Sequence, residues 1–174
     1  MKVNMKHAFY VGGFLAGLCG VLALAIAGVD LLTKDIIKAN KLEKERSGLK
    51  RVFPSGEVDG EAVEVHQGKL EKYWTVKESG SELGRIYSAF GKNSYGQVSL
   101  LIGVYSDFSL GNIVVLENTE SYGQTLEEGY LDPYNAAKDK STAVVSVSCG
   151  ATYGATLCRD MILEAASHYQ GGQA

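Results

Sequence analysis

The residues with the clearest chemical potential lie near the C-terminus, in the segment Cys149-Gly150-Ala151-Thr152-Tyr153. The β-prone run Thr142–Val147 precedes them and predicts a strand. A turn between a strand and a helix directs free backbone N–H groups and the positive end of the helix dipole at a ligand, here beside a threonine hydroxyl. This combination is typical of a phosphate site. The helix that follows is predicted from apolar residues spaced three and four apart, namely Leu157, Met161, Ile162, Ala165, Ala166 and Tyr169.

The motif Gly-Ala-Thr occurs twice here, ending at Thr152 and at Thr156. Gly150 and Gly154 have no side chain, so the backbone of either copy can approach a phosphate closely. Thr156 also suits a structural role, because a threonine at the N-cap stabilises a helix by about 1 kcal/mol. The residues alone leave both threonines as candidates. No hydrolase motif accompanies Cys149, which we interpret as a small buried residue at the end of the strand.

The N-terminal part of the chain predicts a membrane anchor after a short tail, residues 1–8. Residues 9–29 contain no charged side chain, and as a helix they extend about 30 Å, the thickness of the hydrocarbon core of a bilayer. No face of this segment is polar, which argues against a core helix of a soluble domain. A cleaved signal peptide is the alternative, because Lys2 and Lys6 precede the run and A-x-A sequences occur near its end. We favour a retained anchor because the run is longer than the apolar core of a signal peptide.

After the anchor, residues 30–54 predict a charged amphipathic helix that acts as a stalk. Residues 55–174 form the predicted domain. Its five β-prone runs are separated by glycines, which favours an antiparallel meander over alternating strands and helices. The fold class is therefore α+β. The five runs are 62–65, 73–76, 85–90, 98–105 and 112–116.

Three connecting segments of this domain also carry predictions. Asp107–Gly111 predicts a hairpin turn between the runs 98–105 and 112–116, which have the clearest strand pattern. Asn118–Gly129 has little periodicity and predicts a long loop, a feature that is often functional in compact domains. Asp132-Pro133 predicts the start of a short helix, with proline in the first turn.

The composition argues against several functional classes. The net charge is −3 with both signs interspersed, so nothing indicates a nucleic-acid partner. Three cysteines, one of them Cys19 in the apolar run, do not form a disulfide framework. No CxxC pair and no paired Cys/His spacing predicts a metal site.

Several segments resemble the RnfG/NqrC family of flavoprotein subunits. The motif ending at Thr152 resembles the family's Ser/Thr-Gly-Ala-Thr motif, with Cys149 in place of the first hydroxyl residue. Residues 91–104 resemble the family's glycine- and tyrosine-rich start of a central strand. Residues 117–123 occupy the place of its His-x-Glu-Thr-Pro-Gly loop, and residues 33–54 resemble its post-anchor segment. The four segments appear in the family order and cover nearly the whole chain.

In this family a threonine carries FMN through a phosphodiester bond, which a separate flavin transferase forms. The resemblance implies covalent FMN as the cofactor of an FMN-binding domain. It favours Thr152 over Thr156, because Thr152 keeps the preceding run in register with the family. The remaining residues that it places around the cofactor are Cys149, Gly150, Ala151, Tyr153, Gly154, Glu120 and Tyr95.

Three of these residues have alternative roles. Tyr95 and Tyr153 suit stacking on the flavin ring, with ordinary packing inside the domain as the alternative. Glu120 faces the flavin or a docking partner if the loop resemblance holds, and a solvated loop acid is the alternative.

The resemblance implies an electron-relaying component, the FMN-carrying subunit of an Rnf-type ion-translocating ferredoxin:NAD oxidoreductase complex, rather than a self-contained enzyme. Its partners would be the other membrane subunits, membrane lipid and the flavin transferase. The alternative is a stand-alone extracytoplasmic FMN-binding carrier or binding module. Counting Lys and Arg beside the anchor favours a cytoplasmic domain, whereas the resemblance implies the extracytoplasmic side of the cell membrane. We expect the extracytoplasmic side, because long domains translocate largely regardless of such charges.

Overall fold

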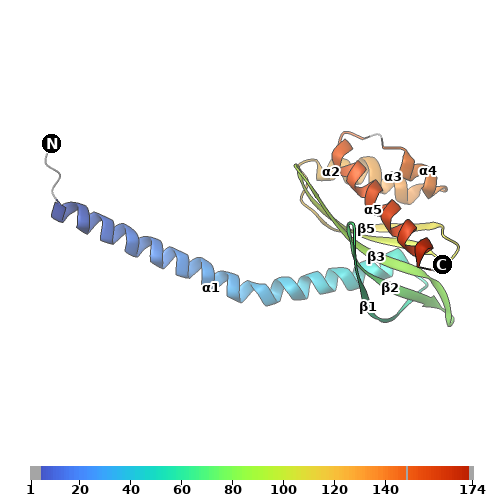
Figure 1. The fold of residues 1–174 in the computed structure, drawn as a ribbon, viewed down its shortest axis with the longest axis horizontal. Helices are drawn as coiled ribbons and strands as arrows, with labels where there is room; N and C mark the ends of the chain where they lie inside the picture. The colour runs from blue at the N-terminus through green and yellow to red at the C-terminus, as the bar shows by residue number, and fades with distance from the viewer. Residues whose placement is uncertain (1–4, 148, 173–174) are drawn as a thin grey trace. The chain divides into compact units, whose positions relative to one another are not determined.

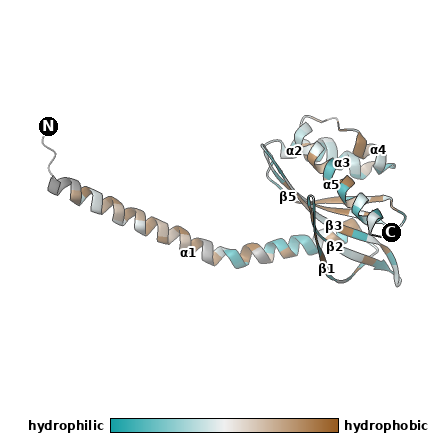
Figure 2. Cartoon of the chain, in the orientation of Figure 1, coloured by the Kyte–Doolittle hydropathy of each residue, from teal (hydrophilic) through white to brown (hydrophobic). Residues whose placement is uncertain are grey.

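A computed structural model of the chain describes residues 5–147 and 149–172. The chain divides after Glu43 into two units. The first is formed by most of helix α1 (Met5–Val52), which contains the predicted anchor and the predicted stalk as far as Val52. Figure 2 shows that α1 is hydrophobic or neutral over its N-terminal part and more hydrophilic toward its C-terminal end. By length and composition α1 can cross a membrane, and a signal sequence at the N-terminus meets the same criteria.

The second unit is built on a five-stranded antiparallel sheet in which each strand pairs with the next one in the sequence (Figure 1). All five β-prone runs lie within these strands, so the predicted meander is confirmed. The predicted turn joins β4 to β5, with the N–H of Tyr105 donating to the carbonyl of Ser109 at 2.9 Å. The strands are β1 (Glu57–Gln67), β2 (Leu70–Glu78), β3 (Ser81–Asn93), β4 (Gly96–Tyr105) and β5 (Leu110–Asn118).

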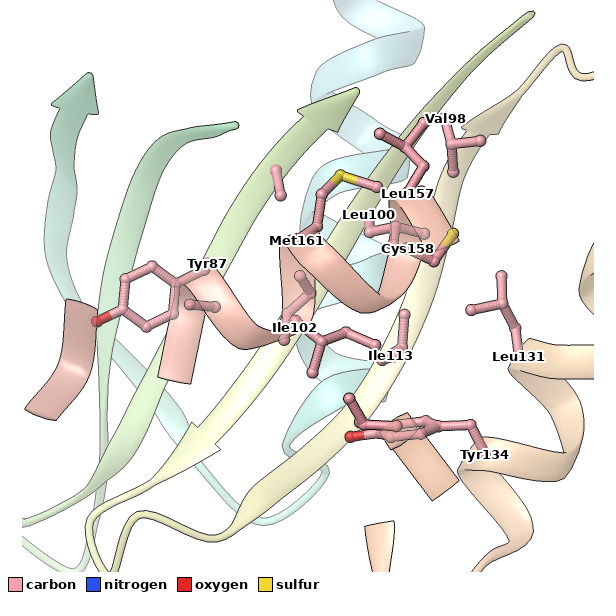
Figure 3. Close-up of a cluster of buried hydrophobic side chains, with 14 of the residues drawn as sticks. Tyr87, Val98, Leu100, Ile102, Ile113, Leu131, Tyr134, Leu157, Cys158 and Met161 are labelled. Carbon is pink, nitrogen blue, oxygen red and sulfur yellow. The ribbon is translucent and has the colours of Figure 1, made fainter. Parts of the chain in front are cut away.

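Helix α5 (Thr152–Gly171) packs across β3 and β4 on one face of the sheet. Figure 3 shows side chains from the strands meeting Met161 and its neighbours on α5. Tyr87, Leu100 and Ile102 of the sheet are fully buried there. Leu100 and Ile102 each contribute about 1.5–3 kcal/mol through burial, so this packing fixes the position of α5 on the sheet.

The C-terminal part of α1 covers the opposite face of the sheet. Leu49 and Val52 are buried there against residues such as Leu101. Gly48 makes the close approach possible, because a Cβ at this position would lie 2.7 Å from the Leu101 Cδ1 atom. Residues from Lys44 onward, which the sequence assigned to the stalk, are therefore part of the compact unit.

The strand predicted over Thr142–Val147 is wrong, because residues Lys140–Val145 form helix α4. The carboxylate of Asp139 accepts hydrogen bonds from the N–H groups and hydroxyls of Ser141 and Thr142, which caps the helix. Such a cap stabilises a helix start, whereas β-propensity is a weak preference that needs a neighbouring strand.

No sixth strand pairs with β5 among the residues described, and a side chain occupies that edge of the sheet. Asn135 accepts a hydrogen bond from the N–H of Ile113 at 2.8 Å and donates to its carbonyl at 2.9 Å. Asn135 belongs to α3 (Asp132–Ala136), whose predicted start at Asp132-Pro133 is confirmed.

The loop predicted over Asn118–Gly129 is only partly present, because α2 (Gly123–Leu126) and the π-helical turn η1 (Glu127–Leu131) begin within it. Leu126, Tyr130 and Leu131 are buried in the same core as α5. Burial of these residues explains why the segment is helical despite its weak periodicity. The second unit is thus an α+β domain, as the sequence predicted.

Candidate functional site

Three segments that are far apart in the sequence meet at one pocket of about 250 Å³. The turn between β3 and β4 contributes Tyr95, and the loop after β5 contributes Glu120 and Tyr122. The third segment, Gly150–Gly154, leads into the first turn of α5. The pocket therefore contains most of the residues that the sequence placed around FMN.

Backbone hydrogen bonds join the β3–β4 turn to the loop after β5. The N–H of Thr119 donates to the carbonyl of Gln97 at 2.9 Å, and the N–H of Ser121 donates to that of Tyr95 at 3.0 Å. These bonds continue the pairing of β4 with β5 beyond the regular strands. Glu120, which lies between the two donors, is thereby held beside the turn.

Thr152 is the first residue of α5, and its side chain is exposed. Its hydroxyl donates to the carbonyl of Cys149 at 3.2 Å. The first backbone bond of the helix joins the N–H of Ala155 to the carbonyl of Ala151 at 2.9 Å. The preceding N–H groups of the first turn have no acceptor within the helix, and the positive end of the dipole lies with them. An anion on the Thr152 hydroxyl would lie next to these groups.

Tyrosine rings form the rim of the pocket. The ring centroids of Tyr95 and Tyr153 are 5.3 Å apart with an angle of 34° between the ring planes. Both side chains are exposed, as is that of Tyr122. Solvent-exposed aromatic faces beside a pocket can stack on a flat aromatic ligand. Contact between two of them shows that the β3–β4 turn and α5 meet at this point.

Glu120 is buried, with 8% of its surface exposed. Its Oε1 atom accepts a hydrogen bond from the Nδ2 atom of Asn93. Its Oε2 atom lies at the first turn of α5, where a Cβ on Gly154 would be 2.6 Å away. A carboxylate at this end of a helix interacts favourably with the dipole. The interpretation of Glu120 as a solvated loop acid is therefore wrong.

Two of the predicted site residues do not line the pocket. Thr156 lies in the second turn of α5 and is half-buried. The N-cap position belongs to Ala151, so the capping role predicted for Thr156 is wrong. Cys149 is half-buried and packs at the edge of the core rather than at the end of a strand.

Sequence reasoning missed two residues of the site, Tyr122 and Asn93. Tyr122 lines the pocket from the loop after β5. Asn93 ends β3 and accepts hydrogen bonds from the N–H groups of Tyr95 and Gly96 at 2.7 and 3.2 Å. Asparagine often bonds to the backbone two residues later in a turn, so the sequence Asn-Ser-Tyr-Gly carried a signal for the turn. It carried none for the contact with Glu120.

The thiol of Cys158 is fully buried in the core that α5 covers. Burial raises the pKa of Cys158 to about 12, with smaller contributions from Glu120 and Cys149. The Cys158 thiol therefore stays protonated at neutral pH and is a poor nucleophile. Within residues 5–147 and 149–172, no group of three His, Cys, Asp or Glu side chains is arranged to hold a metal ion.

No protein-family model matches this chain, and no curated protein matches it.

Proposed function

We propose that this chain is a membrane-anchored flavoprotein that carries FMN covalently on Thr152. In this proposal it relays electrons as the RnfG-type component of an Rnf-type ion-translocating complex. The proposal rests on the family resemblance of the motif at Thr152 together with one structural observation. An exposed threonine hydroxyl, the start of a long helix and a pair of tyrosine rings meet at a single pocket.

The residues around the pocket fit the chemical parts of FMN. The phosphate, bonded to the Thr152 hydroxyl, would lie beside the free N–H groups of α5. Tyr95, Tyr122 and Tyr153 offer aromatic faces for the ring system. The pocket of about 250 Å³ is smaller than the roughly 300–1,000 Å³ of sites that enclose a ligand. Part of the flavin would therefore remain exposed, which suits a carrier that exchanges electrons with partner proteins.

In this proposal the protein binds and orients the cofactor and carries out no redox step itself. Thr152 holds the cofactor, and the helix start offsets the charge of its phosphate. Bound FMN supplies the redox chemistry, for which the protein provides position and electrostatics. A threonine hydroxyl is a weak nucleophile, so attachment requires an external transferase. Its exposure leaves Thr152 accessible to such an enzyme in the folded domain.

The test is attachment of flavin at a defined residue. The full chain, produced together with a flavin transferase, is expected to give a fluorescent band on a denaturing gel under ultraviolet light. Thr152→Val should abolish this band, and the matched variant Thr156→Val should retain it. A wild-type chain without a band would refute covalent attachment, and loss of the band only in Thr156→Val would move the site by one helical turn.

Purification from the native membrane distinguishes the complex from a stand-alone carrier. The proposal expects the chain to copurify, in mild detergent, with membrane subunits of an electron-transport complex. Isolation of the flavin-loaded chain alone would favour the stand-alone carrier. Protease added to the outside of intact cells should cleave the second unit if it lies on the extracytoplasmic side, and protection would place it in the cytoplasm.

A further inference from the structure

Asn93 connects two walls of the pocket through a single side chain. Its Oδ1 atom accepts hydrogen bonds from the N–H groups of Tyr95 and Gly96, at 2.7 and 3.2 Å. Its Nδ2 atom donates to the Oε1 atom of Glu120. The acceptor therefore shapes the turn that carries Tyr95, while the donor holds the carboxylate of Glu120 on the adjacent loop. A carboxamide presents a donor and an acceptor in one rigid planar group, whereas an ionised carboxylate can only accept.

Glu120 depends on this donor because it is buried. A buried carboxylate costs free energy unless hydrogen-bond donors reach it, and a bond from an amide to a carboxylate is among the stronger kinds. The backbone N–H of Glu120 donates to the Oδ1 atom of Asn118 at 3.1 Å. Asn118 thus fixes the main chain of Glu120, and Asn93 fixes its side chain.

Glu120 is packed closely on two sides. A Cβ on Gly96 would lie 2.6 Å from the Glu120 Cα atom, so the turn rests directly on this residue. On the other side, a Cβ on Gly154 would lie 2.6 Å from Glu120 Oε2. Glu120 is held between the β3–β4 turn and the first turn of α5. A displacement of its carboxylate would move the wall next to Thr152.

We propose that Asn93 is a positioning residue of the flavin site. It holds Glu120 in the pocket wall as a fixed hydrogen-bond acceptor for FMN, and it holds Tyr95 on the rim. This inference rests on the proposed function, because FMN is the ligand concerned. FMN carries hydroxyl groups on its ribityl chain and an N–H on its ring, and each of these can donate to a carboxylate. Asn93 acts through Glu120 and Tyr95 and does not itself contact the cofactor.

The experiment reverses the direction of one hydrogen bond in the full chain, loaded with flavin and kept in detergent. Asn93→Asp keeps the acceptor for the turn but sets two carboxylates against each other. Glu120→Gln keeps an acceptor for Asn93 and removes the charge. In the double variant Asn93→Asp/Glu120→Gln the new amide donates to the new carboxylate, so the bond is restored with its polarity reversed. Asn135→Asp is the matched control, since Asn135 binds the backbone of Ile113 outside the pocket.

The readout is the visible circular dichroism of the attached flavin, normalised to flavin content from the denaturing gel. The isoalloxazine ring is flat and achiral, so its signal in this region reports fixed, asymmetric surroundings. The proposal expects a severalfold loss of signal in Asn93→Asp, recovery in the double variant, and a wild-type signal in Asn135→Asp even if that variant is less stable.

The outcomes separate this inference from the proposed function. A fluorescent gel band with an unchanged circular dichroism signal in Asn93→Asp would overturn the positioning role and leave FMN attachment intact. A double variant no better than Asn93→Asp, or an equal loss of signal in Asn135→Asp, would also overturn it, because a general loss of structure would then explain the effect. A wild-type chain without the gel band would remove the proposed function and this inference together.

Discussion

Gly154 provides the sharpest test of how the site is packed. A methyl group at this position would lie 2.6 Å from Glu120 Oε2 and 3.0 Å from Leu126 Cδ2. Both neighbours are buried, so one of them must move. Gly171 lies in the same helix with no atom within 4 Å of its own added Cβ. The pair Gly154→Ala and Gly171→Ala therefore compares the same chemical change in a tight and in an open environment.

The magnitude follows from two opposing effects. Alanine is favoured over glycine inside a helix by up to about 1 kcal/mol, and this value is an upper limit at both positions, which lie in the first turn and at the last residue of α5. Overpacking a filled site costs about 1–3 kcal/mol, and this cost applies only to Gly154. We expect Gly154→Ala to be less stable than Gly171→Ala by about 1–3 kcal/mol. For a domain of this size, that difference lowers the midpoint of thermal unfolding by roughly 3–12 °C.

Thermal unfolding of the full chain in detergent, followed by far-ultraviolet circular dichroism, measures this difference. A second comparison identifies the clashing group, because Glu120→Ala should reduce the cost of Gly154→Ala if the carboxylate is responsible. Equal midpoints for Gly154→Ala and Gly171→Ala would refute the packing argument. In that case Glu120 would not lie against the first turn of α5, and the pocket would have a different wall.

Three further predictions concern the core, the α4 cap and a buried thiol. Met161→Ala should lower the free energy of unfolding by about 2–5 kcal/mol, because Met161 is fully buried. Leu163→Ala, on the exposed side of α5, should change it by less than about 0.5 kcal/mol. Similar values for the two variants in denaturant titrations would contradict the assignment of Met161 to the core. Hydrogen bonds from the first turn of α4 lower the pKa of Asp139 to about 2, below its ordinary value of 3.8, so its stabilising effect is complete above pH 3.8 and is lost as the pH falls through about 2. Unfolding measured between pH 5 and pH 2 should therefore show a steeper loss of stability in the wild-type chain than in Asp139→Asn, and parallel curves would argue against the cap. Burial raises the pKa of Cys158 to about 12, so iodoacetamide at pH 8 should leave this thiol unmodified in the folded chain and should modify it in urea. Peptide mass mapping measures the modification. Labelling of Cys158 in the folded chain would mean that the core opens readily.

The sheet of the second unit is largely encoded in local sequence. Each predicted β-prone run lies within an observed strand, because apolar and β-branched residues suit strands whose two faces are covered, here by α5 and by the C-terminal part of α1. Glycines and short polar segments between the runs specify tight turns, which join strands as antiparallel neighbours. The apolar run near the N-terminus predicts a long helix for a similar reason, since its length and composition suffice.

Predictions from local sequence were wrong where a tertiary contact or a helix cap outweighed β-propensity. Val144 and Val145 favour a strand, yet the carboxylate of Asp139 caps a helix there and Val144 is buried within the core. The edge of β5 was also unavailable to a further strand, because Asn135 binds its backbone. A side chain from a distant segment occupied the hydrogen-bonding groups that a new strand would have needed.

The sequence by itself determined the chemistry available at the candidate site. The motif at Thr152 placed a hydroxyl at the start of an amphipathic helix, and helix geometry dictates that free N–H groups lie beside it. Only the tertiary structure decided which other residues form the pocket. Asn93 and Glu120 are separated by 27 positions, and their contact depends on how β4 pairs with β5 and how α5 lies across the sheet. Local patterns specify secondary structure through short-range hydrogen bonding, whereas such distant contacts follow from the packing of the completed core.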